Sequence, residues 1–357
     1  MQIEHVQTRA RDASEQAASL RDWDQRYEQI SAGRFDGEVR QLQVGPVQVF
    51  TERANQTVMQ AGRVNANLVS VALVRPGDAP GWCDGHALED ECFIHYDADD
   101  QFDLLAAANA KILAISVDRE AFGLLSEQVG GVNVEQLDVV PTLLKASRRA
   151  CAAYSTLVED ALAFAQGREG LNGHEASRRM LALSLTDALL NCLRTAEPLA
   201  PLGLSASSRR RIVARARAYM NDRAHEVIAV PDLCQAIGTS RRALQYAFED
   251  VMQISPVTYL RAMRLNRVRQ DLRLNPEETV ADVASRWGFW HPSRFASDYK
   301  ALFGELPSAS RTAFQRGRPQ AFGEVVCGGG HAAHAQAGLR GHRFAHGDRG
   351  CDNPSHA

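Results

Sequence analysis

Apolar and polar residues follow two different periods along this chain of 357 residues. Between residues 39 and 117 they alternate in short runs, such as 39–50 and 67–74, separated by Gly, Pro and Asp. A period of two is typical of strands with one buried face. The pattern predicts a small antiparallel β-barrel or roll in this part of the chain.

From residue 141 the apolar period lengthens toward about 3.6 residues, which is typical of amphipathic helices. One such stretch begins near Leu143, and a second runs from His174 to Leu193. Two helices of this kind can form an antiparallel hairpin that packs on the strands before them. Residues 197–203 contain two prolines and a glycine and predict a linker.

The stretch 205–311 contains the same pattern twice. The equivalent positions are 50 residues apart before a central turn and 51 apart after it. Each copy predicts a helix that ends at glycine, a short turn and a second helix, which is a helix-turn-helix. Pro231 suits the first turn of a helix, and Thr279 with Asp282 forms a capping box. The equivalent pairs are Gly238 and Gly288, Leu244 and Phe295, Phe248 and Tyr299, and Pro256 and Pro307.

The second helix of each copy has an apolar side and a polar side. At about 100° per residue, one side gathers large apolar residues and the other gathers residues that can contact DNA. Arg is the commonest bidentate partner of guanine, and Gln is the partner of adenine. We expect Leu244, Phe248, Val251, Phe295, Tyr299 and Leu302 to face inward. The candidate DNA contacts are Arg241, Arg242, Gln245 and Tyr246 in the first copy, and Trp290, His291, Ser293, Arg294 and Ser297 in the second.

A third, arginine-rich helix is predicted from Ser207 or Ser208 onward, ahead of both copies. We expect Arg209 and Arg211 to touch only the DNA backbone. Arg210, Arg215 and Arg217 lie on the same predicted helix, where we expect them to face phosphates or solvent.

The residues of the repeat resemble the AraC/XylS family of transcriptional regulators. The segments 240–248 and 287–299 carry this resemblance, and Pro256 to Leu272 would be the connecting helix between two helix-turn-helix motifs. The segment 287–299, together with 23–27 and 35–38, is similar to ethanolamine-operon regulators of the EutR type.

The resemblance implies a set of partners and a role. It implies a cupin-like N-terminal barrel that holds a small-molecule effector, with ethanolamine or a cobalamin as candidates. It also implies a helical hairpin that forms a homodimer, binding to promoter or operator DNA, contact with RNA polymerase, and activation of a catabolic operon. It implies no enzymatic activity and no cofactor.

The predicted fold class is α+β, with a β-rich effector region and an all-α double helix-turn-helix region. The predicted segments are an N-terminal arm, the effector domain, the helical linker or dimerisation region, the DNA-binding domain and a disordered Gly/His-rich tail. In that order they span residues 1–38, 39–140, 141–196, 205–315 and 316–357.

Charge divides the chain in the same way. Residues 1–204 carry 18 Lys and Arg against 29 Asp and Glu, a net charge of −11, whereas residues 205–318 carry 19 against 11, a net charge of +8. A basic region gains affinity for DNA by neutralising phosphates. No long apolar run or secretory signal is present, and the seven cysteines do not pair by number, so we expect a cytoplasmic protein with reduced thiols and no membrane contact.

A second class of function stays open from the residues alone. Cys83, His86, Cys92 and His95 are metal-ligand types at regular spacing. Their place in a strand-turn-strand argues against convergence, because Cys92 and His95 would point to opposite faces of one strand. We therefore assign no metal ligand, and keep as the alternative an enzyme or metal-dependent sensor fused to a DNA-binding module.

Overall fold

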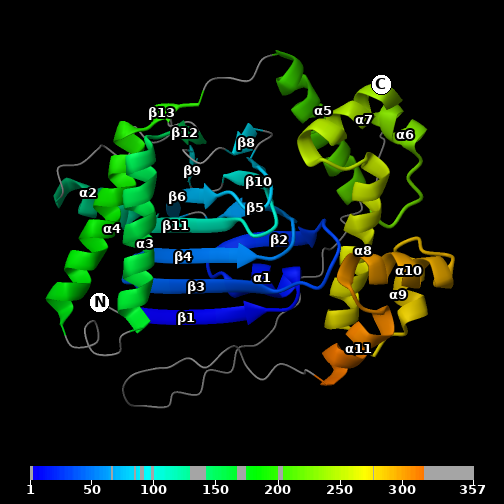
Figure 1. The fold of residues 1–357 in the computed structure, drawn as a ribbon, viewed down its shortest axis with the longest axis horizontal. Coiled ribbons are helices and arrows are strands. Elements are labelled where there is room, and N and C mark those ends of the chain that lie inside the picture. The colour runs from blue at the N-terminus through cyan, green and yellow to red at the C-terminus, as the bar shows by residue number, and fades with distance from the viewer. Residues whose placement is uncertain are drawn as a thin grey trace, which may run out of the picture. The chain divides into compact units, whose positions relative to one another are not determined.

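The structure of the chain is a computed structural model that describes residues 3–316, except positions 66, 84–85, 89–91, 98–99, 129–141, 167–173, 200–203 and 276. These described residues all belong to one unit, Met1–Val326. The tail predicted over residues 316–357 lies outside them, apart from its first residue. Figure 1 shows the helices and strands.

Most of the N-terminal strands form a large antiparallel sheet. Neighbouring strands alternate in direction, and the hairpin between β3 and β4 turns at Gly45, whose φ of 57° suits glycine. In hydrogen-bonding order the strands are β1 (Ile3–Ala10), β3 (Gly37–Val44), β4 (Val47–Ala54), β11 (Lys111–Asp118), β6 (Leu68–Arg75), β9 (Cys92–Tyr96), β12 (Leu143–Lys145) and β13 (Glu197–Pro198).

A smaller sheet packs on one face of the large one. Phe50 and Ile94 of the large sheet share an apolar core with Phe102 and Leu104 of the small sheet. Trp23 lies between them, with its ring 5.6 Å from that of Phe50 and 5.8 Å from that of Phe102. The strands of the small sheet are β2 (Trp23–Gln29), β5 (Val58–Val64), β10 (Gln101–Ala106), β7 (Gly81–Cys83) and β8 (His86–Leu88).

The strand pattern is confirmed, but the predicted cupin-like barrel is not. The described strands form two open sheets, and neither closes on itself. Alternation of apolar and polar residues specifies which face of a strand is buried. It does not specify whether the last strand pairs with the first, so the same pattern serves a sandwich as well as a barrel.

The stretch predicted as an N-terminal arm, residues 1–38, contains two paired strands and a short helix. Here β1 pairs with β3, the short helix α1 (Ala13–Ser19) follows, and β2 pairs with β5. Asp12 caps α1 by accepting a hydrogen bond of 2.9 Å from the backbone N–H of Ser14. The residues of β1 are largely polar, and β1 is the edge strand of its sheet, where polar residues are tolerated.

Helices cover the other face of the large sheet (Figure 1). Both helices predicted after residue 141 are present, as α3 (Arg148–Gln166) and α4 (Glu175–Thr195), and α2 (Arg119–Gln128) precedes them. Tyr154 of α3 ties the layers together, because its hydroxyl donates to the carbonyl of Val71 at 2.5 Å and accepts from the N–H of Ile115 at 2.9 Å. The apolar faces of α3 and α4 therefore pack on strands.

The C-terminal part of the described chain is helical. It comprises α5 (Leu204–Asp222), α6 (Val230–Ile237), α7 (Arg241–Met252), α8 (Pro256–Leu274), α9 (Val280–Arg286), α10 (Pro292–Phe303) and α11 (Pro307–Arg316). Within the described ranges, no helix is both long enough and apolar enough to span a bilayer.

One carboxyl group is enclosed within the N-terminal region. Glu52 is 3% exposed and accepts hydrogen bonds from the amides of Gln16 at 2.6 Å and Gln60 at 3.2 Å, and from the hydroxyl of Tyr27 at 2.8 Å. None of the cations that the structure describes forms an ion pair with it. Burial raises the pKa of Glu52 to about 7, although the hydrogen bonds from Gln16 and Tyr27 act in the opposite direction.

This raised pKa gives a pH-dependent stability. Because the folded chain binds the Glu52 proton more tightly than the unfolded chain, stability should fall as pH rises from about 4.5 through 7. Glu52→Gln should remove about 2–3 kcal/mol of the difference in unfolding free energy between pH 5 and pH 8. Urea denaturation at pH 5 and at pH 8 measures the unfolding free energy of each protein. Glu38→Gln, an exposed position on a neighbouring strand, is the control, and equal pH dependence in all three proteins would contradict the assignment.

Candidate nucleic-acid interface

The first helix-turn-helix consists of α6 and α7. Gly238 ends α6 with a left-handed backbone, φ 63° and ψ 47°, and the N–H of Thr239 donates to the carbonyl of Cys234 at 2.9 Å. This is the glycine-terminated helix end that the sequence predicted. Ser240 then caps α7 by accepting a hydrogen bond of 3.1 Å from the N–H of Ala243. The two helices are therefore joined by three residues, each with a defined role.

The second helix-turn-helix consists of α9 and α10. The hydroxyl of Thr279 accepts from the N–H of Asp282 at 3.2 Å and donates to its carboxylate at 2.6 Å, so the predicted cap is present. Gly288 again takes the left-handed conformation, with φ 81°. The turn to α10 is longer than in the first motif, as the change in repeat offset predicted.

The inner faces of α7 and α10 are as predicted. The structure buries all six apolar residues expected there, and none is more than 8% exposed. We call α7 and α10, the second helices of the two motifs, the recognition helices. These buried residues anchor them in two separate apolar cores, one around α6 and α7 and one around α9 and α10. The opposite faces are consequently fixed toward solvent.

On α7 the predicted contact residues lie at the surface and are linked to one another. Arg241, Arg242 and Tyr246 are exposed and Gln245 is half-buried. The guanidinium of Arg242 lies 5.3 Å from the centre of the Tyr246 ring and donates to its hydroxyl at 3.3 Å. Gln245 donates to the Glu249 carboxylate at 2.5 Å. The face is therefore polar, and its side chains can exchange these neighbours for base edges.

On α10 the predicted residues are more open. Ser293, Arg294 and Ser297 are exposed, as are Trp290 and His291 just before the helix. Trp290 is 68% exposed, which is unusual for a tryptophan. Among the described residues Arg294 has no hydrogen-bond or ion-pair partner. A free guanidinium and an open indole at one helix end suit contact with a nucleic acid.

The predicted arginines of α5 divide into two groups. Arg211 and Arg215 are exposed, and Arg209 is half-buried and forms an ion pair of 2.8 Å with Asp250 at the end of α7. Arg217 was expected to face phosphate or solvent, but this is wrong, since it is only 6% exposed. Helical spacing turns it away from Arg211 and into the protein.

The four residues weighed as zinc ligands do not converge in the structure. Cys83 lies on β7, His86 on β8, and Cys92 and His95 on β9. The thiol of Cys83 is 3.2 Å from the hydroxyl of Tyr96, within the core between the sheets. Over the residues that could be placed, no three His, Cys, Asp or Glu side chains form a group that could hold a metal ion.

Comparison with known proteins agrees with this geometry. The family model described as a helix-turn-helix domain matches residues 233–313. A probable thc operon regulatory protein of Rhodococcus erythropolis is 37% identical over 99 residues, which cover 27% of this chain and 30% of that protein. XylDLEGF operon transcriptional activator 2 of Pseudomonas putida is 33% identical over 93 residues, covering 25% of this chain and 59% of that protein.

Solved structures show similarity over the same part of the chain. The DNA-binding domain of AdpA, a global transcriptional factor solved with a target DNA, is 27% identical and matches with a TM-score of 0.29, covering 30% of this chain and 97% of that one. A probable AraC family transcriptional regulator from Rhodopseudomonas palustris is 30% identical, with a TM-score of 0.28, over 30% of this chain and 98% of that one.

The two motifs and the family match together define a helix-turn-helix DNA-binding domain at the C-terminal end of the described chain. The chain is similar to these operon regulators, in line with the resemblance to the AraC/XylS family that the sequence indicated. The matches to the two curated relatives span less than two thirds of their lengths.

The exposed arginines should differ in what they recognise. Arg242→Ala and Arg294→Ala should each relax preference at one or two base pairs and cost about 1–3 kcal/mol at the preferred site, because Arg reads guanine. Arg211→Ala should weaken binding to all sequences alike, because we expect Arg211 to contact phosphate. Site selection with each variant at fixed salt measures this. If the first two variants lose affinity with no change in base preference, those arginines are phosphate contacts.

Proposed function

We propose that this protein is a sequence-specific transcriptional regulator that binds double-stranded DNA through both helix-turn-helix motifs. The observation that carries the proposal is the pair of polar faces on α7 and α10. Each is held outward by buried apolar residues and carries arginine with other hydrogen-bonding groups. Two such faces, from two copies of one pattern, suit two successive major grooves.

The charges of the two parts of the chain support this proposal. The basic charge of residues 205–318 supplies affinity for phosphate, and the acidic charge of residues 1–204 keeps the other part of the chain away from DNA. Arg211 and Arg215 are exposed on α5 and available for the backbone. Specificity would then come from the outer faces of α7 and α10.

We further propose that the N-terminal sheets and helices form the effector-binding and assembly part of the regulator. The similarity to ethanolamine-operon regulators makes ethanolamine and a cobalamin the first effectors to test, with activation of a catabolic operon as the outcome. Phe164 of α3 and Met180 of α4 are 50% and 62% exposed, which supports these helices as the place of a homodimer contact. RNA polymerase is the expected partner at a promoter, and no catalytic step is assigned to the chain.

Selection from random duplex DNA with the full chain tests the proposal. It should enrich one sequence that binds at least about a thousandfold more tightly than random DNA at the same salt. Ethanolamine, alone and with cobalamin, should change that affinity. A protein that only coats DNA would bind with strong salt dependence but enrich nothing, and that result would refute sequence-specific regulation.

A further inference from the structure

Two buried arginines occupy equivalent places in the two helix-turn-helix motifs. In the first, Arg217 of α5 donates to the hydroxyl of Tyr259 at 3.1 Å. In the second, Arg269 of α8 donates to the hydroxyl of Ser310 at 3.0 Å. Tyr259 and Ser310 are 51 residues apart, which is the spacing of the repeat, and Arg217 and Arg269 are 52 apart, which is within two residues of it. Each motif thus uses one arginine to bind the helix that follows its recognition helix.

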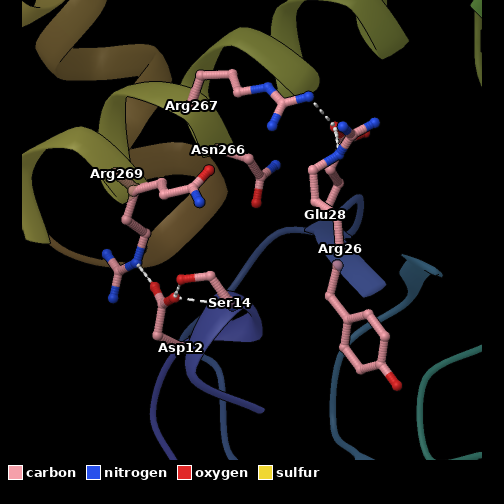
Figure 2. A pocket seen from close by; sticks show the side chains of 9 residues that line it. Asp12, Ser14, Arg26, Glu28, Asn266, Arg267 and Arg269 are labelled. Carbon is pink, nitrogen blue, oxygen red and sulfur yellow. Dashed lines mark hydrogen bonds and ion pairs between the residues drawn. The ribbon is translucent and has the colours of Figure 1, made fainter. Parts of the chain in front are cut away.

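A carboxylate from the N-terminal region meets each of these arginines. Asp103 of β10 forms an ion pair of 2.6 Å with Arg217. Asp12, the cap of α1, forms an ion pair with the Nε of Arg269 (Figure 2). Both arginine residues are less than 10% exposed, so their guanidinium groups require acceptors. The N-terminal region therefore supplies one such acceptor to each motif.

Between these two contacts, residues 28–33 lie across the joint of the motifs, and we name them the strap. The N–H and carbonyl of Gln29 bond the side chain of Asn266 on α8, both at 2.9 Å. The N–H of Gly33 donates to the carbonyl of Leu302 at the end of α10, at 2.9 Å. The Glu28 carboxylate accepts from Tyr259 at 3.2 Å. The strap is thereby bonded to both motifs.

One residue of the strap, Ile30, packs between the two motifs. Ile30 packs against the apolar core of the first motif and against that of the second. These cores are separate, and α8 contributes buried residues to both, so the angle between the motifs depends on α8 and on what packs beside it. Gly304 closes the end of α10 beside the strap, where an added Cβ would lie 2.8 Å from the Cγ of Arg34.

The contact between the strap and α8 is polar, and little empty space is left between their side chains. Figure 2 shows Glu28 of the strap, with Arg26 just before it in β2, near Asn266 and Arg267 of α8, while Arg269 of α8 points toward Asp12. The space between them is about 10 Å³, which holds about one water molecule. Charge and close packing both favour a single arrangement of β2 on α8, rather than a sliding contact.

We propose that Asp12, Asp103 and the strap are positioning elements that fix the two recognition helices relative to each other, and so determine the spacing between the two groups of base pairs that the protein reads. This inference rests on the proposed function. Inserting one base pair moves the second group by about 3.4 Å and turns it by about 35° around the duplex. A braced pair of motifs cannot follow this movement, whereas a pair joined by α8 alone can bend to it.

The test compares spacing tolerance in the full chain. Binding is measured to the selected site and to versions with one base pair inserted or removed between the two groups. The test variant is Asp12→Asn with Asp103→Asn, which removes both charges and keeps the cap of α1, because Asn also caps helices. The matched control is Asp36→Asn, which removes an exposed N-terminal carboxylate whose ion pair of 3.0 Å is with Arg9.

The wild type and the control should lose at least about tenfold in affinity when the spacing changes, the equivalent of one disrupted base contact or more. The double variant should lose less than about threefold in affinity when the spacing changes. Ile30→Ala should also lose less affinity than the wild type, and it replaces the double variant as the test if that variant does not fold. Equal spacing preference in every protein, or an equal loss at all spacings, would overturn the inference. Failure to select any sequence would instead refute the proposed function, and this inference with it.

Discussion

The packing of the N-terminal region on the C-terminal helices depends on two buried guanidinium groups that require hydrogen-bond acceptors. A buried charge without partners is very costly, so Arg217 and Arg269 each require several oxygen acceptors. The repeat supplies one set, since the hydroxyls of Tyr259 and Ser310 come from the helix after each recognition helix. The helical region also gives Arg269 the Glu305 carboxylate at 2.8 Å, and the N-terminal region adds Asp103 to Arg217 and Asp12 to Arg269. Removing Asp103 or Asp12 leaves a buried arginine with fewer acceptors. The contact between the two parts of the chain is therefore specific, because only one arrangement pairs these charges.

This constraint connects the opposite charges of the two parts of the chain to its architecture. The acidic N-terminal residues provide acceptors on the side of the helices that holds Arg217 and Arg269, while Arg242 and Arg294 stay exposed. One basic region thus has two kinds of arginine, buried ones that assemble the protein and surface ones that can contact DNA. Net charge alone does not distinguish them.

The sequence predicted local features well, because they depend on neighbouring residues. Helix ends at Gly238 and the cap at Thr279 are set by a few adjacent residues, and the inward faces follow from helical spacing. It did not predict features that depend on distant segments. The barrel is not confirmed, the arm contains paired strands, and the predicted exposure of Arg217 was wrong. Sheet closure, the pairing of β1 with β3 and the contact with Asp103 all join residues far apart in the chain. One signal was present in the sequence, since the 52 residues between Arg217 and Arg269 are close to the spacing of 50 to 51 between the motifs.

Both motifs should read one DNA duplex together, at a separation that the fold fixes. Base-by-base interference mapping of the full chain on its selected site tests this most directly. Two groups of essential base pairs should appear on one face of the duplex, with centres about one helical turn, or ~10 base pairs, apart. A single essential group, or two groups on opposite faces of the duplex, would contradict the claim.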